Sequence, residues 1–182
     1  MKTFSVKIVM FTLLLLAGAC NLVEFSLGRI KGDSGISYND SKVLWEELKT
    51  TNGNSYNYTI RFLSFAGFGS NTTITVTEGV VTERRYEAFE QREAEGGLIE
   101  EIVESYVETG ADIGTHEEGA EALNIDELYD VCISKYLVVS PAENTVYFNT
   151  WGEGVISTCG YVPDGCMDDC FIGFEMSHFE WM

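Results

Sequence analysis

Positive charge is scarce in this chain of 182 residues, which has 11 Lys and Arg residues against 29 Asp and Glu residues and a formal net charge of −18 at pH 7. Such a surface repels phosphate backbones and anionic lipid headgroups, which argues against binding to nucleic acid or to membranes by charge. Its simplest interpretation is a self-repelling, solvated surface, and it is also compatible with cationic partners or divalent cations.

Other features are scarce or missing as well. The chain has two prolines, and its 18 glycines are scattered, which excludes a collagen-like or linker-like chain. It has no Gly-x-Gly-x-x-Gly motif and no P-loop. The apolar run Ile8–Ala19 is shorter than the roughly 20 residues that span a bilayer. Hydrophobic residues make up 45% of the chain, which is enough for the packed core of one domain.

The first twenty residues predict export. Two lysines precede an apolar run, and small residues then lead to Cys20, which is the order found in secretory signal peptides. The segment Leu16–Cys20 resembles a bacterial lipobox, with Ala17 where that motif usually has leucine. We therefore predict a signal peptide over 1–19, lipidation of Cys20 and a place in the bacterial cell envelope. The alternative is plain secretion after cleavage near Ala19.

The other cysteines predict two disulfides, because an even number in an exported chain is typical of a disulfide framework: Cys132, Cys159, Cys166 and Cys170. Three pairings are open. An extended strand would place Cys166 and Cys170 about 13 Å apart, whereas a disulfide needs Cα atoms within about 7 Å. Their pairing therefore requires a turn at Met167–Asp169, which two aspartates permit. We favour Cys166 with Cys170, and Cys132 with Cys159.

The pattern of apolar residues predicts a tether over 20–38 and one α+β domain over 39–182. Helices are expected from Asp40 or Ser41 to Leu48, and from Asn124 or Asp126 to Tyr136. Strands are expected over Tyr56–Phe65, Thr72–Thr77, Val80–Phe89, Leu98–Val107, Thr145–Asn149, Val155–Val162 and Phe171–Trp181. This order favours a twisted antiparallel sheet of six to seven strands with the two main helices packed on one face.

Two segments, Leu98–Val107 and the tether, leave alternatives. Leu98–Val107 has apolar residues at helical spacing, but its β-branched and aromatic residues favour a strand. Glu90–Gly97 is polar and is expected to be an exposed connection, and 110–119 is expected to be a loop. Within the tether, a short strand at Val23–Phe25 is the alternative.

Acidic residues gather around one predicted turn and are candidate ligands for calcium: Asp164, Asp168 and Asp169. Hard cations prefer several carboxylate and carbonyl oxygens, but the chain lacks an EF-hand pattern, and ordinary turn chemistry explains the same residues. A Cys₃His zinc site is disfavoured because its spacing matches no common finger and an oxidising compartment favours disulfides. Its ligands would be Cys159, Cys166, Cys170 and His178.

No nucleophile accompanies a base in the local sequence. His116 lies beside Glu117 and Glu118, yet neither it nor His178 has a serine or a free cysteine in a suitable local context. Pairs of acidic residues such as Glu100–Glu101 are expected by chance in a chain this acidic, so they do not by themselves indicate a catalytic site. The sequence favours a non-catalytic binding or structural protein without a cofactor. Calcium binding and a secreted hydrolase are the alternative functions.

Two aromatic residues are candidates for a binding surface, because Tyr, Trp and Phe are enriched at protein interfaces. We expect Phe68 and Trp151 to be exposed, and we assign Phe65, Tyr161 and Trp181 to the core. The expected partner is an envelope protein or a small ligand. The lipid on Cys20 would be the only contact with the membrane.

Several short sequence segments, in their order along the chain, resemble an uncharacterised family of small exported bacterial lipoproteins. They are Trp45, Tyr56–Thr59, Ile74–Val76 with Glu78–Val81, Ile125–Tyr129 and the pair Asp168-Asp169. The resemblance covers about residues 40–181. The sequence departs from the family pattern at Glu90–Gly119 and Cys159–Cys170. It implies no activity and transfers no catalytic residue. The predicted arrangement is also similar to β-lactamase-inhibitor-type domains, in which a concave sheet grips a protein partner.

Overall fold

The structure, a computed structural model, describes residues 30–182. The predicted signal peptide, Cys20, the alternative strand at Val23–Phe25 and the first part of the tether therefore lie outside the described residues. In chain order the elements are α2 (Tyr38–Asn52), β1 (Tyr56–Leu63), β2 (Phe68–Thr77), β3 (Val80–Ala94), β4 (Gly97–Thr109), a 3-10 turn (Gly110–Asp112), α3 (Ile125–Val131), a π-helical turn (Cys132–Tyr136), β5 (Asn144–Thr150), β6 (Ile156–Pro163) and β7 (Ile172–Trp181).

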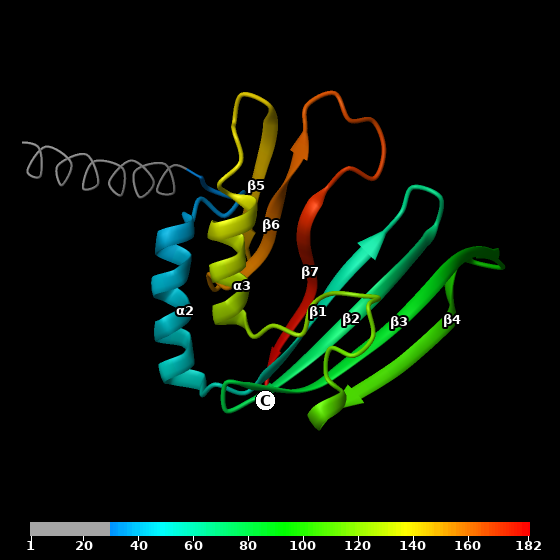
Figure 1. The fold of residues 1–182 in the computed structure, drawn as a ribbon, viewed down its shortest axis with the longest axis horizontal. Helices are drawn as coiled ribbons and strands as arrows, with labels where there is room; N and C mark the ends of the chain where they lie inside the picture. The colour runs from blue at the N-terminus through cyan, green and yellow to red at the C-terminus, as the bar shows by residue number, and fades with distance from the viewer. Residues whose placement is uncertain (1–29) are drawn as a thin grey trace, which may run out of the picture.

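The seven strands form one antiparallel sheet in the order β4-β3-β2-β1-β7-β6-β5. The helices α2 and α3 lie against the half of the sheet that contains β5, β6 and β7, while β3 and β4 extend well beyond them (Figure 1). The predicted α+β fold is confirmed. No helix within residues 30–182 has the length and apolar character needed to cross a membrane.

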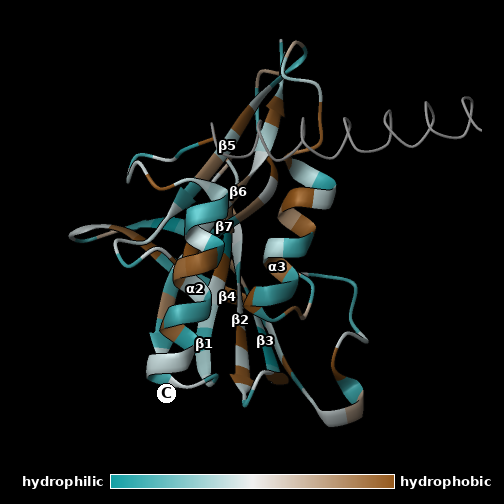
Figure 2. Ribbon diagram, turned by 90° about the vertical axis from the view of Figure 1, so that its left-hand side faces the viewer, coloured by the Kyte–Doolittle hydropathy of each residue, from teal (hydrophilic) through white to brown (hydrophobic). Residues whose placement is uncertain are grey.

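Local sequence explains where the two helices begin. The side chain of Ser37 caps α2 by accepting a hydrogen bond from the Asp40 N–H, and Gly53, with φ 89°, ends the helix. Asn124 and Glu127 form a complete capping box at the start of α3. Both helices alternate hydrophilic and hydrophobic stretches, as expected for helices with one buried face (Figure 2).

Aromatic rings dominate the core between the helices and the sheet. Trp45 of α2 stacks on Trp181 of β7 with ring centroids 5.4 Å apart and meets the edge of Tyr56 at 5.3 Å. The hydroxyl of Tyr56 accepts a hydrogen bond from the Ile125 N–H, so it also satisfies a free donor at the start of α3. Burial raises the pKa of Tyr56 far above its ordinary value. The prediction that Trp181 belongs to the core is correct in that it packs against the core while staying partly accessible.

The polar segment Glu90–Gly97 is largely exposed, as predicted, but most of it belongs to the end of β3. β3 continues to Ala94 and pairs with β4, which begins at Gly97, so the two strands form a long ribbon. Side chains near the tip of this ribbon are exposed on both faces, and the sequence there has no apolar alternation to mark a strand. The prediction of a strand at Leu98–Val107 is confirmed.

The end of the predicted tether is packed on the domain. Ser37 and Tyr38 are buried, and Ile30 packs against the core. Gly32 lies so close to the backbone of Phe148 and Asn149 that a Cβ atom there would clash with them. The packed body therefore includes residues from 30 onward, and α2 begins two residues earlier than predicted.

Both favoured disulfides are present. Cys132–Cys159 joins the π-helical turn to β6 across the core, with Cα atoms 5.8 Å apart. Cys166–Cys170 closes the loop between β6 and β7, with Cα atoms 6.1 Å apart, so the predicted turn at Met167–Asp169 forms. Disulfides are typical of proteins that fold outside the reducing cytoplasm.

The two disulfides should contribute unequally to stability. The chain-entropy argument gives about 3.5 kcal/mol for the 27-residue separation of Cys132–Cys159 and about 2 kcal/mol for the 4-residue separation of Cys166–Cys170. We expect the double variant Cys132→Ala/Cys159→Ala to lose more free energy of unfolding in urea than Cys166→Ala/Cys170→Ala. Equal losses, or a greater loss from the second pair, would contradict this entropic interpretation.

Candidate functional site

The sheet divides into two branches along β7. The end of β7 pairs with β1 as far back as Met176, which lies opposite Ile60, and its first part, Ile172–Glu175, pairs with β6. The register between β1 and β7 shifts at Thr59/Ile60, and beyond this point the two strands diverge (Figure 1). Such a shift bends the strand and ends the pairing. A cleft of about 410 Å³ opens between the branches.

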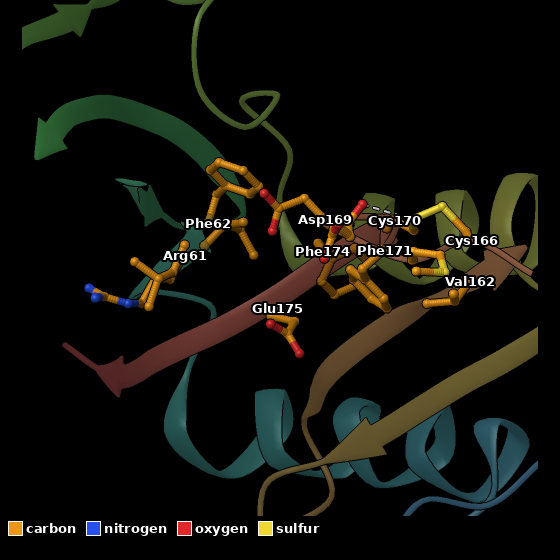
Figure 3. Close-up of a pocket in the computed structure, with 14 residues that line it drawn as sticks. Arg61, Phe62, Val162, Cys166, Asp169, Cys170, Phe171, Phe174 and Glu175 are labelled. Carbon is orange, nitrogen blue, oxygen red and sulfur yellow. Dashed lines mark hydrogen bonds between the residues drawn. A yellow bond between two sulfur atoms is a disulfide. The ribbon is translucent and has the colours of Figure 1, made fainter. Parts of the chain in front are cut away.

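Four segments line the cleft: the end of β1, the end of β6, the disulfide loop and the start of β7 (Figure 3). The apolar part of the lining comes from Phe62, Leu63, Val162, Phe171 and Phe174. Phe171 fills the space above Gly160, where a Cβ atom would clash with its ring. The walls of the cleft are therefore set by packing within the two branches of the sheet.

Asp169 connects the two loops at the mouth of the cleft. Its Oδ2 accepts a hydrogen bond of 2.6 Å from the Ser64 hydroxyl, and its Oδ1 accepts one of 3.0 Å from the Phe65 N–H. The bond from Ser64, with that from Phe65, holds the pKa of Asp169 below its usual range. The β1–β2 turn is thereby fixed to the loop that the Cys166–Cys170 disulfide closes.

The polar groups of the cleft carry net negative charge. Asp168, Asp169 and Glu175 line it together with one cation, Arg61. The Arg61 guanidinium is paired with Glu100 and lies over the ring of Phe89 at 4.6 Å, pointing away from the disulfide loop (Figure 3). Arg61 is thus already neutralised, and the carboxylates determine the charge that a ligand would meet.

A smaller hollow of about 210 Å³ adjoins the cleft on the helix-covered face of the sheet. It shares Ile60, Gly173 and Phe174 with the cleft, and its far side is formed by Leu128 of α3 and by Tyr136. Phe174, which is buried, separates the two spaces. The two hollows therefore lie next to each other at the start of β7.

Large apolar side chains are exposed around the mouth. Phe65 and Met167 are each 89% exposed at the tips of the two loops that Asp169 connects, and Phe68 is half exposed. The exposure of Phe68 agrees with the sequence prediction. The assignment of Phe65 to the core is wrong, because it lies at the tip of a hairpin turn. Exposed apolar groups gathered in one place are typical of an interaction site.

The remaining predicted binding and core aromatics lie elsewhere. Trp151 follows β5 and is 36% exposed; its indole N–H lies 3.4 Å from the Met176 sulfur, and it does not line the cleft. Tyr161 is partly buried in β6. A binding role for Phe68 or Trp151 stays a prediction.

The candidate metal ligands are only partly brought together. Asp168 and Asp169 line the cleft, whereas Asp164 does not. Within residues 30–182, no group of three or more His, Cys, Asp or Glu side chains has an arrangement that could hold a metal ion. The zinc alternative is also replaced by disulfides, since Cys159, Cys166 and Cys170 are all oxidised.

A second polar arrangement, which the sequence did not reveal, lies under the loop 110–120. Arg84 of β3 and Glu108 of β4 face each other at 2.9 Å and are 2% and 1% exposed. Glu108 also accepts hydrogen bonds of 2.7 Å from the Gly114 N–H and 2.8 Å from the His116 N–H, and it lies 2.8 Å from His116 Nδ1. The His116 ring stacks on Tyr106.

This network serves to hold the loop on the sheet. Arg84 also donates to the carbonyl oxygens of Glu118 and Ala120, so both charged groups are occupied by loop backbone. Burial by itself would raise the pKa of Glu108, but the bonds from Gly114, His116 and Arg84 outweigh it and hold the pKa well below its usual range. His178, the other histidine, is exposed on β7, 3.7 Å from Glu180.

No protein family model matches this chain, and neither the curated proteins nor the solved structures contain a match. The resemblance to small exported lipoproteins therefore stays a prediction.

Removing the charge of Glu108 should destabilise the protein and change its response to acid. Glu108→Gln leaves Arg84 buried without its partner, which we expect to cost about 3 kcal/mol of unfolding free energy at pH 7. Because the pKa of Glu108 is lower in the folded chain than its ordinary value of about 4.3, its contribution to stability is present above that value and is lost as the pH falls from there toward the lower pKa of the folded chain. The variant should therefore lose less stability than the wild type on acidification.

Urea unfolding at a series of pH values measures both effects. Glu104→Gln is the matched control, since Glu104 is exposed on the same strand, and it should change stability by less than about 0.5 kcal/mol. The double variant Arg84→Met/Glu108→Leu should be more stable than Glu108→Leu alone. Similar losses in Glu108→Gln and Glu104→Gln would show that the buried ion pair is not a significant constraint.

Proposed function

We propose that this protein is a non-catalytic binding module of the bacterial cell envelope, anchored by a lipid on Cys20, and that its cleft binds a cationic group attached to an apolar body. The observation that carries the proposal is the cleft where β1 and β7 diverge, about 410 Å³ in volume, with apolar walls and a net negative lining. Sites for small ligands commonly measure about 300–1,000 Å³ and combine apolar walls with a few polar groups.

The chemistry of the lining selects the ligand class. Phe62, Phe171 and Phe174 offer apolar and aromatic contacts, and aromatic faces also attract cations. Asp168 and Glu175 are exposed carboxylates with no ion pair among the described residues, so an ammonium or guanidinium group would find partners there. A lysine or arginine side chain within an apolar peptide segment and an alkylamine both have this chemistry.

The construction of the cleft favours binding over catalysis. The Cys166–Cys170 disulfide and the Asp169 hydrogen bonds hold the loops at its mouth, so little conformational freedom is lost when a ligand enters. Neither histidine lines it, and Glu108 is fully engaged in holding the loop 110–120. Calcium binding and a hydrolase activity stay alternative predictions from the sequence.

An apolar fluorescent amine should bind to the cleft. We expect dansylcadaverine to bind with increased emission and to bind at least tenfold more tightly than neutral dansylamide, because only the amine meets the carboxylates. The variant Asp168→Asn/Glu175→Gln should remove this preference, and Phe62→Ala should weaken both probes. Fluorescence titration of the two probes into the three proteins measures all six affinities.

The control for charge is Asp112→Asn/Glu153→Gln, which makes the same residue changes at exposed positions that do not line the cleft. It should bind the amine as the wild type does. If both double variants weaken binding equally, the overall charge of −18 attracts the probe and the cleft is not its site.

Lipid attachment can be tested separately in a bacterium that processes lipoproteins. The wild-type protein should partition into the detergent phase of a Triton X-114 extract, and its N-terminal peptide should carry acyl chains on Cys20. Cys20→Ser should partition into the aqueous phase. A mature wild-type chain that begins near residue 20 without added lipid mass would support the secreted alternative.

A further inference from the structure

The outer edge of β4 has few of the protections of an edge strand beyond its four glutamates and one β-bulge. β4 is 13 residues long, and among residues 30–182 it pairs with β3 alone. Natural edge strands are commonly short, carry lysine or proline, or are covered by another segment. β4 has no lysine, arginine or proline, and its one irregularity is the register shift opposite Ala88/Phe89.

The opposite edge of the same sheet, formed by β5, is protected. β5 has seven residues, and Gly32 lies against the carbonyl oxygen of its Phe148 and against Asn149. One edge is therefore short and in contact with the N-terminal segment, while the other is long and open.

Apolar side chains accompany the open edge of β4. They lie on a strand with no helix over it, and they are between 47% and 66% exposed: Leu98, Ile99, Ile102, Val103 and Val107. From Tyr106 onward the loop 110–120 covers one face of the strand, because Glu108 is buried beneath it. The accessible stretch is therefore 98–104, which we call the open edge.

Charge selects the kind of strand that fits this edge. Between Val80 and Thr109 the chain contains nine glutamates and three arginines. Arg61 and Arg92 neutralise Glu100 and Glu101, whereas Glu104 has no ion pair among the described residues. A second copy of β4 would bring the same negative ribbon against this one, and like charges on adjacent strands are destabilising.

We infer that the open edge is a docking site for an extended segment of another protein in which basic and apolar residues alternate, bound as an eighth strand next to β4. Main-chain hydrogen bonds would provide the affinity, and the basic residues would meet the acidic ribbon. This site is distinct from the cleft, which lies on the other side of β2 and β1 in the order of the sheet.

The test uses a fluorescein-labelled nine-residue peptide of alternating lysine and valine, titrated into the domain and followed by fluorescence anisotropy. A matched peptide with N-methylated amides along one edge keeps the charge and apolar content but cannot complete the ladder, so it should bind at least tenfold more weakly. Hydrogen exchange of the Ile99–Val103 amides should slow when the unmodified peptide binds.

Two protein variants locate the site. Ile99→Lys/Val103→Lys should weaken the peptide at least tenfold, whereas Val80→Lys/Val138→Lys, which adds the same charge at exposed positions away from the edge, should stay within threefold of wild type. The cleft variant Asp168→Asn/Glu175→Gln should also stay within threefold.

Several results would overturn the inference. One is equal binding of the N-methylated peptide, which would mean attraction by charge alone. Another is loss of binding in the cleft variant, which would place the peptide in the cleft. The inference also fails if the peptide does not bind, or if sedimentation shows a dimer that Ile99→Lys/Val103→Lys separates, because the edge would then serve a second copy.

Discussion

The change of partner along β7 is the constraint on which the rest of the structure depends. One strand belongs to two branches of the sheet, pairing with β1 through its second half and with β6 through its first half. A straight strand paired with β1 throughout would close the sheet and leave no cleft. The register shift at Thr59/Ile60 bends the pairing instead, and Trp45 packs on Tyr56 and Trp181 beyond it, where the branches meet.

Glycines paired with aromatic rings allow close packing in both branches of the sheet. The ring of Phe89 lies where a Cβ on Gly69 would be, and Arg61 covers the other side of the ring. Phe171 occupies the corresponding space above Gly160. Gly173, with φ 153°, approaches the backbone of Cys159 and Gly160 so closely that no side chain fits. These positions require glycine for packing.

Local signals explain which features could be predicted from the sequence. Asn124 or Asp126 as a start, followed by an apolar stripe, predicted the second helix, and the Asp-Asp turn made the Cys166–Cys170 bridge reasonable. The strand from Glu90 to Ala94 was missed because its side chains are solvated on both faces, which removes the alternation that marks a half-buried strand. Phe65 was misassigned because an aromatic residue suggests a core position, and only the hairpin places it at a tip.

The site itself depends on contacts that no local pattern encodes. Ser64 and Asp169 are 105 residues apart, and Arg84 and Glu108 are 24 apart on neighbouring strands. Arg84 and Glu108 meet only in the observed strand register, because a shift of one residue would turn one of them to the opposite face. Ser64 and Asp169 lie in loops, and they meet only once the sheet brings those loops together. A single sequence carries the residue types but not the register, so it predicted the sheet and the helices and could not locate the cleft.

The strong negative charge of the chain affects both the open edge of β4 and the cleft. An open edge strand and a cleft rimmed by Phe65 and Met167 would promote self-association in a neutral protein, since both offer unpaired backbone or apolar surface. Identical molecules with a net charge of −18 repel one another at long range, which opposes that association without covering the surfaces. The same field attracts basic partners. Charge therefore discriminates between copies of this chain and cationic ligands before any short-range contact forms, which allows the edge and the cleft to remain open.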